Sequence, residues 1–234
     1  MKYAVITGAT QGIGKATAAR LLRKGFSVAV CARGQKDLDE LQKDWSETYP
    51  DQQVICLRAD MGVPEDVQAF ADKILSTFPQ VDILVNNAGV FTPGTLADEP
   101  EGNLEMLMGV NLFGSYRLTR LLLPHMKERQ SGHIFNICSV ASLQAYPNGG
   151  AYSITKYALL GFSDNLRLEL TPNHIRVTAV CPGATYTHSW IESGVAAARM
   201  MEAEDVASVI WNAYSLSENA NIDRIVMRPV TGDL

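Results

Sequence analysis

The segment Lys2-Tyr-Ala-Val-Ile-Thr-Gly8-Ala-Thr-Gln-Gly12-Ile-Gly14-Lys15 lies near the start of the chain and determines how its fold begins. The apolar run of residues 3–6 predicts a buried strand, and the apolar spacing of residues 13–24 predicts an amphipathic helix. Three glycines lie between them, within seven positions. A strand, a glycine-rich turn and a helix in this order are typical of a nucleotide-binding site.

Each of the three glycines has an expected role. Gly8 allows a sharp turn after the strand because it has no β-carbon. Gly12 allows the backbone to approach a pyrophosphate, and Gly14 allows the helix to pack closely on the strand. The first helical turn then offers unpaired N–H groups to phosphates, although an ordinary tight turn is the alternative. The residues expected to contact the nucleotide here are Gly8, Thr10, Gln11, Gly12, Ile13 and Gly14.

The composition restricts the class of partner. The chain has 20 Lys and Arg against 25 Asp and Glu, a net charge of −5, and no basic run that would neutralise nucleic-acid phosphates. No apolar stretch reaches the ~18 residues of a membrane span, and the early first strand leaves no room for a signal peptide. Cys31, Cys56, Cys138 and Cys181 lack metal-ligand spacing. We therefore expect a cytoplasmic protein with reduced thiols and no metal, nucleic-acid or membrane partner.

Strand-like and helix-like segments alternate along the 234 residues without a linker or repeat. This alternation predicts a Rossmann-like α/β fold, in which about seven parallel strands form a doubly wound sheet with helices on both faces, in three layers. We expect one domain, residues 1–234. The predicted strands are 3–6, 27–32, 53–59, 81–86, 133–138, 174–180 and 222–227, and the predicted helices are 13–24, 35–47, 64–78, 102–130, 150–171 and 203–217.

The end of the second predicted strand should select the cofactor. In folds of this kind an acidic residue there binds the adenosine ribose hydroxyls, but the sequence has Ala32 and Arg33. Ala32 removes the repulsion that a 2′-phosphate would meet, and Arg33 offers it a forked, permanent positive charge. We therefore predict NADP(H) as the preferred cofactor and NAD(H) as the second choice. A solvated arginine is the alternative, and Gln11 adds no second positive charge.

Two further strand ends carry candidate residues. Asp60 ends the third predicted strand, where its carboxylate would accept a hydrogen bond from an adenine amino group. Capping the helix that begins at Pro64 is an equally good interpretation. The fourth strand ends in Asn86-Asn87-Ala88-Gly89, whose small and amide residues suit a backbone close to a cofactor, although a simple turn has a similar composition.

Tyr152 and Lys156 lie four residues apart in a predicted helix, so their side chains share one face. An isolated pair of this kind is commonly an exposed pair of side chains without a catalytic role. Ser139, however, ends the fifth predicted strand at the carboxyl edge of the sheet, where open α/β folds bind ligands. The three side chains together favour a reactive site.

Jointly these motifs resemble those of the short-chain dehydrogenase/reductase family in its single-domain form. They follow the family's order and spacing, and only Thr185 departs from the aliphatic residue more common at its position. The longer, epimerase-like branch is disfavoured because its glycine spacing differs. The matching residues are Thr7-Gly8-x-x-x-Gly12-x-Gly14, Asn86-Asn87-Ala88-Gly89, Asn111, Ser139, Tyr152-x-x-x-Lys156, and Pro182-Gly183 followed by Thr185 and Thr187.

The resemblance implies a catalytic set of Asn111, Ser139, Tyr152 and Lys156. Tyr152 would be the general acid in carbonyl reduction or the base in the reverse reaction, and Ser139 would hydrogen-bond the substrate oxygen. Tyrosine has an ordinary pKa of about 10, so Lys156 and oxidised nicotinamide would have to lower it. The helix would kink at Asn111, whose backbone carbonyl would hold a water that passes protons from Lys156.

The resemblance also implies the cofactor contacts beyond the glycine turn. Lys156 would hold the nicotinamide ribose, while the side chain of Thr187 and the backbone of Thr185 would orient the carboxamide. The implied contacts are Arg33, Asp60, Asn87, Ala88, Gly89, Tyr152, Lys156, Pro182, Gly183, Thr185 and Thr187.

These residues predict an NADP(H)-dependent carbonyl reductase or alcohol dehydrogenase acting on a small molecule. The alternatives are an NAD-dependent alcohol dehydrogenase working oxidatively and a non-catalytic NADP-binding regulatory protein. Residues 182–201 are expected to form a substrate lid, with Tyr146, His188 and Trp190 as candidate pocket residues, unless the lid packs on itself or on a neighbour. Family resemblance implies a homodimer or homotetramer through helices 102–130 and 150–171.

Overall fold

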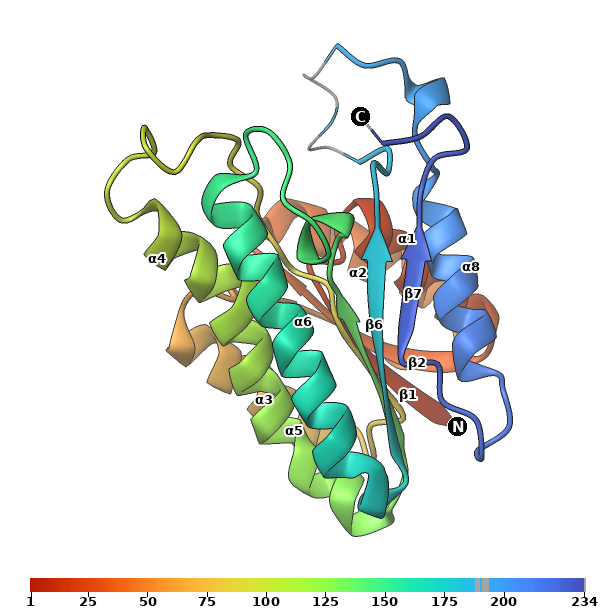
Figure 1. Cartoon of the computed structure of the whole chain (residues 1–234). Helices are drawn as coiled ribbons and strands as arrows, with labels where there is room; N and C mark the ends of the chain where they lie inside the picture. Colours follow the sequence, from red (N-terminus) through yellow and green to blue (C-terminus); the bar gives the residue numbers. More distant parts are fainter. Residues whose placement is uncertain (188–189, 191–193, 234) are drawn as a thin grey trace.

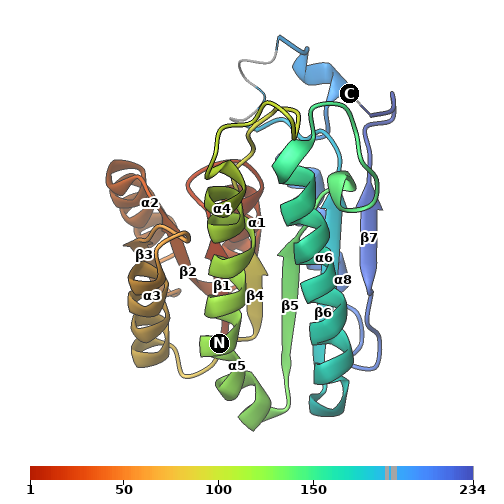
Figure 2. The ribbon, with the colours of Figure 1, turned by 60° about the vertical axis from the view of Figure 1, so that its left-hand side comes forward.

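The seven predicted strands are present and pair in parallel, in the order β3-β2-β1-β4-β5-β6-β7 (Figures 1 and 2). The computed structural model describes residues 1–187, 190 and 194–233. The predicted doubly wound, Rossmann-like sheet is therefore confirmed. The strands are β1 (Lys2–Thr7), β2 (Phe26–Ala32), β3 (Val54–Arg58), β4 (Ile83–Asn86), β5 (Gly132–Ile137), β6 (Ile175–Pro182) and β7 (Arg224–Met227).

Helices cover both faces of the sheet and complete the three layers (Figure 2). On one face lie α1 (Gly12–Arg23), α2 (Gln35–Thr48) and α8 (Ala203–Tyr214), and on the other α3 (Pro64–Thr77), α5 (Ser115–Arg129) and α6 (Gly150–Leu170). Leu21 and Ile210 are fully buried in the first apolar layer, as are Phe70 and Leu118 in the second. Both faces of each central strand are covered, which explains why these strands read as continuous apolar runs.

The predicted long helix 102–130 is interrupted, as the family resemblance implied. α4 (Asn103–Met108) runs into a π-helical turn, η1 (Gly109–Gly114), before α5 begins. Gly114 in this turn approaches the carbonyl oxygen of Met61 so closely that a β-carbon would overlap it. The wider turn holds Asn111 fully buried. Inserted π turns of this kind are frequent at functional sites.

The other differences from the predicted elements are small. β4 begins two residues later than expected, although the backbone N–H of Asp82 still donates to the Tyr3 carbonyl at 2.8 Å. β6 extends to Pro182, and α8 ends at Tyr214. In the region predicted to be irregular, Thr185 forms a β-bridge with Met201. Over the described part of the chain, three short 3₁₀ helices connect the elements: Val140–Ser142, Thr171–Asn173 and Ala197–Arg199.

The strand order reverses between β1 and β4, since the chain first winds outward to β3 and then returns to the other side of β1. The loops leaving these two neighbouring strands run to opposite faces, which opens a crevice at their carboxyl ends. Within the described residues, no helix is long and apolar enough to cross a membrane. The four cysteines are free thiols, and only Cys56 is not fully buried.

Asp82 joins the start of β4 to three other elements. Its Oδ2 accepts a hydrogen bond from the backbone N–H of Tyr3 at 2.7 Å, and its Oδ1 pairs with Arg129 at the end of α5 at 3.2 Å. Its backbone carbonyl accepts from the N–H of His133 in β5. The carboxylate is 8% exposed, so little water is available to replace these partners.

We predict that Asp82→Ala lowers the free energy of unfolding by about 1–3 kcal/mol, because the N–H of Tyr3 loses its acceptor in a buried setting. Urea denaturation followed by circular dichroism measures this change. The control is Asp72→Ala, whose carboxylate bonds only Gln68 on the surface of α3 and should change stability by less than about 0.5 kcal/mol. Equal effects of the two substitutions would contradict the proposed role of Asp82.

Candidate active site

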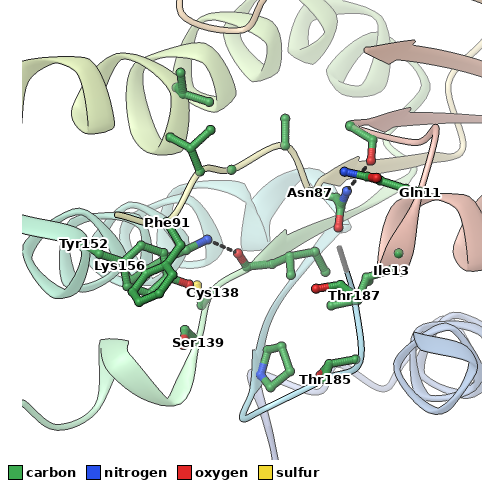
Figure 3. A pocket seen from close by; sticks show the side chains of 18 of the residues that line it. Gln11, Ile13, Asn87, Phe91, Cys138, Ser139, Tyr152, Lys156, Thr185 and Thr187 are labelled. Carbon is green, nitrogen blue, oxygen red and sulfur yellow. Dashed lines mark hydrogen bonds between the residues drawn. The ribbon is translucent and has the colours of Figure 1, made fainter. Parts of the chain in front are cut away.

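A cleft of about 540 Å³ lies at the carboxyl ends of the strands, at the reversal of strand order (Figure 3). It brings together most of the residues singled out from the sequence. Gly14 and Asn111 lie behind the lining, and His188 is outside the described residues. The predicted residues that line the cleft are Gly8, Thr10, Gln11, Gly12, Ile13, Arg33, Asp60, Asn87, Ala88, Gly89, Ser139, Tyr146, Tyr152, Lys156, Pro182, Gly183, Thr185, Thr187 and Trp190.

The glycine turn is built as a cradle for a ligand backbone. Gly8 has φ +67°, and a β-carbon there would lie 2.9 Å from the Cα of Ala88. Gly12 has φ +55° and begins α1, whose first turn carries no acidic side chain and no side-chain cap. The N-terminal N–H groups of α1 therefore remain available for a phosphate. A β-carbon on Gly14 would overlap the Gly8 carbonyl oxygen, consistent with close packing of α1 on β1.

The end of β4 holds this turn in place. The hydroxyl oxygen of Thr7 accepts from the backbone N–H groups of Asn87 and Ala88, at 3.0 and 2.9 Å. In return, the side-chain amide of Asn87 donates to the carbonyls of Thr7 and Gly8, at 2.8 and 2.9 Å. Thr7 had no predicted role of its own. Its position as the last residue of β1, beside the amide pair of β4, is the signal that identifies it afterwards.

At the other end of the cleft, Arg33 and Asp37 are both exposed and both line the cavity. Asp37 belongs to the first turn of α2, with its carboxylate near Gly34. Sequence reasoning missed this carboxylate, because it lies in the helix rather than at the strand end. A ligand group bound here meets one positive and one negative side chain.

Asp60 does not cap α3, so that interpretation is wrong. Its Oδ1 accepts from the N–H of Gly62 at 2.8 Å, and its own N–H donates to Asp66. Val63 is the residue that precedes the helix, without a side-chain cap. Asp60 therefore shapes the turn before α3 while lining the cleft.

Ser139, Tyr152 and Lys156 converge beside β5 (Figure 3). The Nζ of Lys156 is buried, donates to the Ile137 carbonyl at 2.8 Å, and lies 5.7 Å from the centre of the Tyr152 ring. The side chain of Ser139 lies beside that of Tyr152 (Figure 3). Ser139 also caps a short 3₁₀ helix by accepting from the N–H of Ala141 at 3.1 Å, which fixes its orientation.

The electrostatics of Tyr152 differ from the expectation. Burial raises its pKa to about 12, with the hydrogen bond from Ser139 acting in the opposite direction. Burial likewise lowers the pKa of Lys156. The ammonium of Lys156 bonds the Ile137 carbonyl, so its charge does not overcome the desolvation of the phenolate. In the protein chain itself, Tyr152 is therefore a protonated phenol at neutral pH.

Asn111 lies behind the cleft lining, where its side chain bonds two segments that carry site residues. Its side-chain amide donates to the Val90 carbonyl at 2.9 Å and to the hydroxyl of Thr155 at 3.0 Å, and its Oδ1 accepts from the N–H of Val90 at 2.7 Å. These bonds tie the segment after β4 to α6. A β-carbon at Gly89 would lie 3.3 Å from the Oδ1 of Asn111 and 3.5 Å from the Nζ of Lys156. Neither Val90 nor Thr155 was identified from the sequence.

The segment after β6 faces the glycine turn. A β-carbon on Gly12 would lie 3.0 Å from the Cγ2 of Thr187, so this threonine is directly opposite the turn. Thr185 is buried, and its hydroxyl donates to the Gly183 carbonyl at 3.0 Å. Its β-bridge to Met201 ties the segment to the residues that precede α8. Of the described residues, none form a cluster that would hold a metal ion.

Comparison with known proteins gives the same assignment. The family model described as short chain dehydrogenase matches residues 2–197. A sepiapterin reductase from Chlorobaculum tepidum is 33% identical, over 98% of this chain and 97% of that protein. The alcohol dehydrogenase from Thermococcus sibiricus, complexed with 5-hydroxy-NADP, superposes with a TM-score of 0.91, 27% identity and coverage of 100% and 99%. The L-sorbose reductase from Gluconobacter frateurii, complexed with NADPH and L-sorbose, superposes with a TM-score of 0.90 and 25% identity. The match covers 97% of this chain and 95% of that one.

The chain therefore belongs to the short-chain dehydrogenase/reductase family, and it is an oxidoreductase with that family's nucleotide-binding fold.

We predict that Tyr152 does not ionise below about pH 11 in the cofactor-free protein, because burial disfavours the phenolate. The measurement is tyrosinate absorbance against pH, as the difference between wild type and Tyr152→Phe. A tyrosinate that titrates near neutral pH in the wild type and is missing in the variant would show that Lys156 dominates over burial.

Proposed function

We propose that this chain is an NADPH-dependent carbonyl reductase that converts a ketone or aldehyde to an alcohol. The observation that supports it best is the convergence of Ser139, Tyr152 and Lys156 at one end of a cleft whose middle is the glycine turn. The residues present fit a nicotinamide dinucleotide, since Gly8 and Gly12 leave space that a β-carbon would fill, and α1 offers free N–H groups. NADPH, when bound, supplies the hydride for the carbonyl carbon.

Tyr152 donates the proton in this reaction. Reduction places negative charge on the carbonyl oxygen, and a protonated hydroxyl nearby neutralises it. With its raised pKa the Tyr152 phenol is protonated at neutral pH, and stabilisation of its tyrosinate form would make it a stronger proton donor. Ser139 lies beside Tyr152 (Figure 3) and offers a hydrogen bond to the same substrate oxygen.

Lys156 and Asn111 support Tyr152 as the proton donor by stabilising its tyrosinate and by supplying it with a new proton. The buried ammonium of Lys156 lies beside the Tyr152 ring, where it stabilises the tyrosinate left after proton donation. The π-helical turn at Asn111 lies next to Gly89 and Lys156, on the route that a proton would take from solvent to Tyr152. In the reverse direction the same residues would remove a proton from an alcohol.

Recognition of the 2′-phosphate of NADPH depends on Arg33. Its guanidinium is exposed at the adenosine end of the cleft, and within the described residues it forms no ion pair. Asp37 opposes this preference because its carboxylate repels a phosphate from the same end. The NADP and NADPH complexes of similar structures support NADP(H) as the cofactor of this cleft.

We also propose that the enzyme is a homodimer or homotetramer. α4, η1, α5 and α6 expose large apolar side chains on one side of the molecule, which association through these helices would cover. These side chains are Met106, Phe113, Tyr116, Ile154, Tyr157 and Leu168.

We predict that Tyr152→Phe lowers kcat for carbonyl reduction by roughly two to four orders of magnitude, because the proton donor is lost. Cofactor affinity should be retained, since the ring remains. The measurement is NADPH oxidation with a ketone under single-turnover conditions, with Tyr157→Phe on the same helix as the control. Near-normal turnover by Tyr152→Phe would contradict the mechanism. An inert wild type that still binds NADPH would favour the regulatory alternative.

We predict that Arg33→Ala weakens NADPH binding roughly tenfold or more, because a charge-assisted hydrogen bond is lost. NADH has no 2′-phosphate, so its affinity should remain within about twofold of wild type. Calorimetric titration of both cofactors at one ionic strength measures this. Asp37→Asn is the matched control and should tighten NADPH binding. Equal weakening of NADPH and NADH by Arg33→Ala would refute the role of Arg33.

A further inference from the structure

Phe91 presents a large apolar ring to the cleft and is 41% exposed. It follows β4 by five residues, and its ring centre lies 4.9 Å from that of Tyr152, with the ring planes at 79° (Figure 3). In an edge-to-face pair, one ring keeps both of its faces free of the other. The proton transfer by Tyr152 does not require Phe91. An exposed aromatic ring beside the reacting hydroxyl is therefore a surface for the substrate.

Tyr146 provides a second ring from a different segment. It lines the same cleft as Tyr152. A β-carbon on Gly149 would lie 2.9 and 3.0 Å from the Cε1 and Cδ1 atoms of Tyr146. The ring is therefore packed against the Gly149 backbone, immediately before α6 begins. This contact fixes the ring of Tyr146 relative to Tyr152.

The segments that carry these two rings are joined through their backbones. The N–H of Gly94 donates to the carbonyl of Asn148 at 3.1 Å, and a β-carbon on Gly150 would lie 2.6 Å from the Gly94 carbonyl oxygen. Phe91 and Tyr146 thus have a fixed spatial relation. Among the described aromatic pairs, Phe91 contacts Tyr152 and does not stack on Tyr146.

We propose that Phe91 and Tyr146 form the walls of an aromatic slot, and that the substrate is a ketone or aldehyde whose carbonyl is attached to a planar aromatic ring. This inference rests on the proposed function and names its substrate class. Aromatic walls attract a flat ring through offset or edge-to-face contacts, with centroids ~4.5–7 Å apart. A ring held between them directs its carbonyl oxygen toward Ser139 and Tyr152, which lie beside Phe91.

The test compares acetophenone with cyclohexyl methyl ketone, which has the same carbonyl on a saturated ring of similar size. Their dissociation constants are measured by calorimetry on enzyme loaded with NADP⁺ or NAD⁺, whichever binds more tightly. We expect the dissociation constant of acetophenone to be at least roughly fivefold lower than that of its saturated analogue, as two aromatic contacts allow. Phe91→Leu and Tyr146→Leu should each move this ratio toward one, whereas Phe91→Tyr and Tyr146→Phe should preserve it.

Two further variants separate the slot from a general effect on folding. Gly149→Ala keeps both aromatic residues but crowds the Tyr146 ring and the Ser153 hydroxyl, so it should also reduce the ratio, with its melting temperature measured alongside to detect any effect on α6. Tyr49→Leu follows α2, outside the cleft lining, and should leave the ratio unchanged. A wild-type ratio near one, or a ratio unaffected by both leucine variants, would overturn the slot.

Turnover of the two ketones with NADPH is recorded separately. Reduction of both ketones with equal binding would refute the aromatic slot and leave the reductase intact. Preferential binding of acetophenone without turnover would support the slot and count against the proposed reductase.

Discussion

The hydrogen bonds between Thr7 and Asn87 are the interaction on which the site depends. Together with one bond from Asn87 to Gly8 and one from Ala88 to Thr7, they lock the end of β1 to the end of β4 at the reversal of strand order, with four bonds in all between 2.8 and 3.0 Å. The glycine turn is thereby held open toward the cleft. Because β5 pairs directly with β4, the same anchoring positions Ser139 relative to the turn. A nucleotide site and a reactive site are thus built on adjacent strand ends.

Burial and charge act in opposition at Tyr152. Desolvation disfavours the phenolate, and the ammonium of Lys156 is partly engaged by the Ile137 carbonyl. The protein therefore keeps Tyr152 protonated, in the form that a reductase uses first. Oxidation would require additional positive charge near the phenol, which an oxidised nicotinamide provides.

Residue types and local spacing predicted much of the fold and the composition of the site. The strand, glycine turn and helix predicted over residues 2–24 indicated where the cleft lies. The spacing of Tyr152 and Lys156 predicted that both lie on one helical face. Val90 and Thr155 could not be found in this way, because each reaches the site through tertiary packing against Asn111. Asp37 was missed because it lies in the first turn of α2 and not at the end of β2. Asp60 forms a local turn with Gly62 in place of a helix cap, and the pKa of Tyr152 depends on burial by other elements, which local sequence does not encode.

We expect the cleft to carry out NADPH-dependent reduction of a carbonyl group. The most direct measurement is the rate of cofactor oxidation by the wild-type protein with a panel of ketones and aldehydes, comparing NADPH and NADH at one ionic strength. We expect the protein to oxidise the cofactor only when a carbonyl compound is present, with a clearly higher kcat/KM for NADPH than for NADH. Activity confined to alcohols with NAD⁺ would contradict it and would favour an oxidative dehydrogenase.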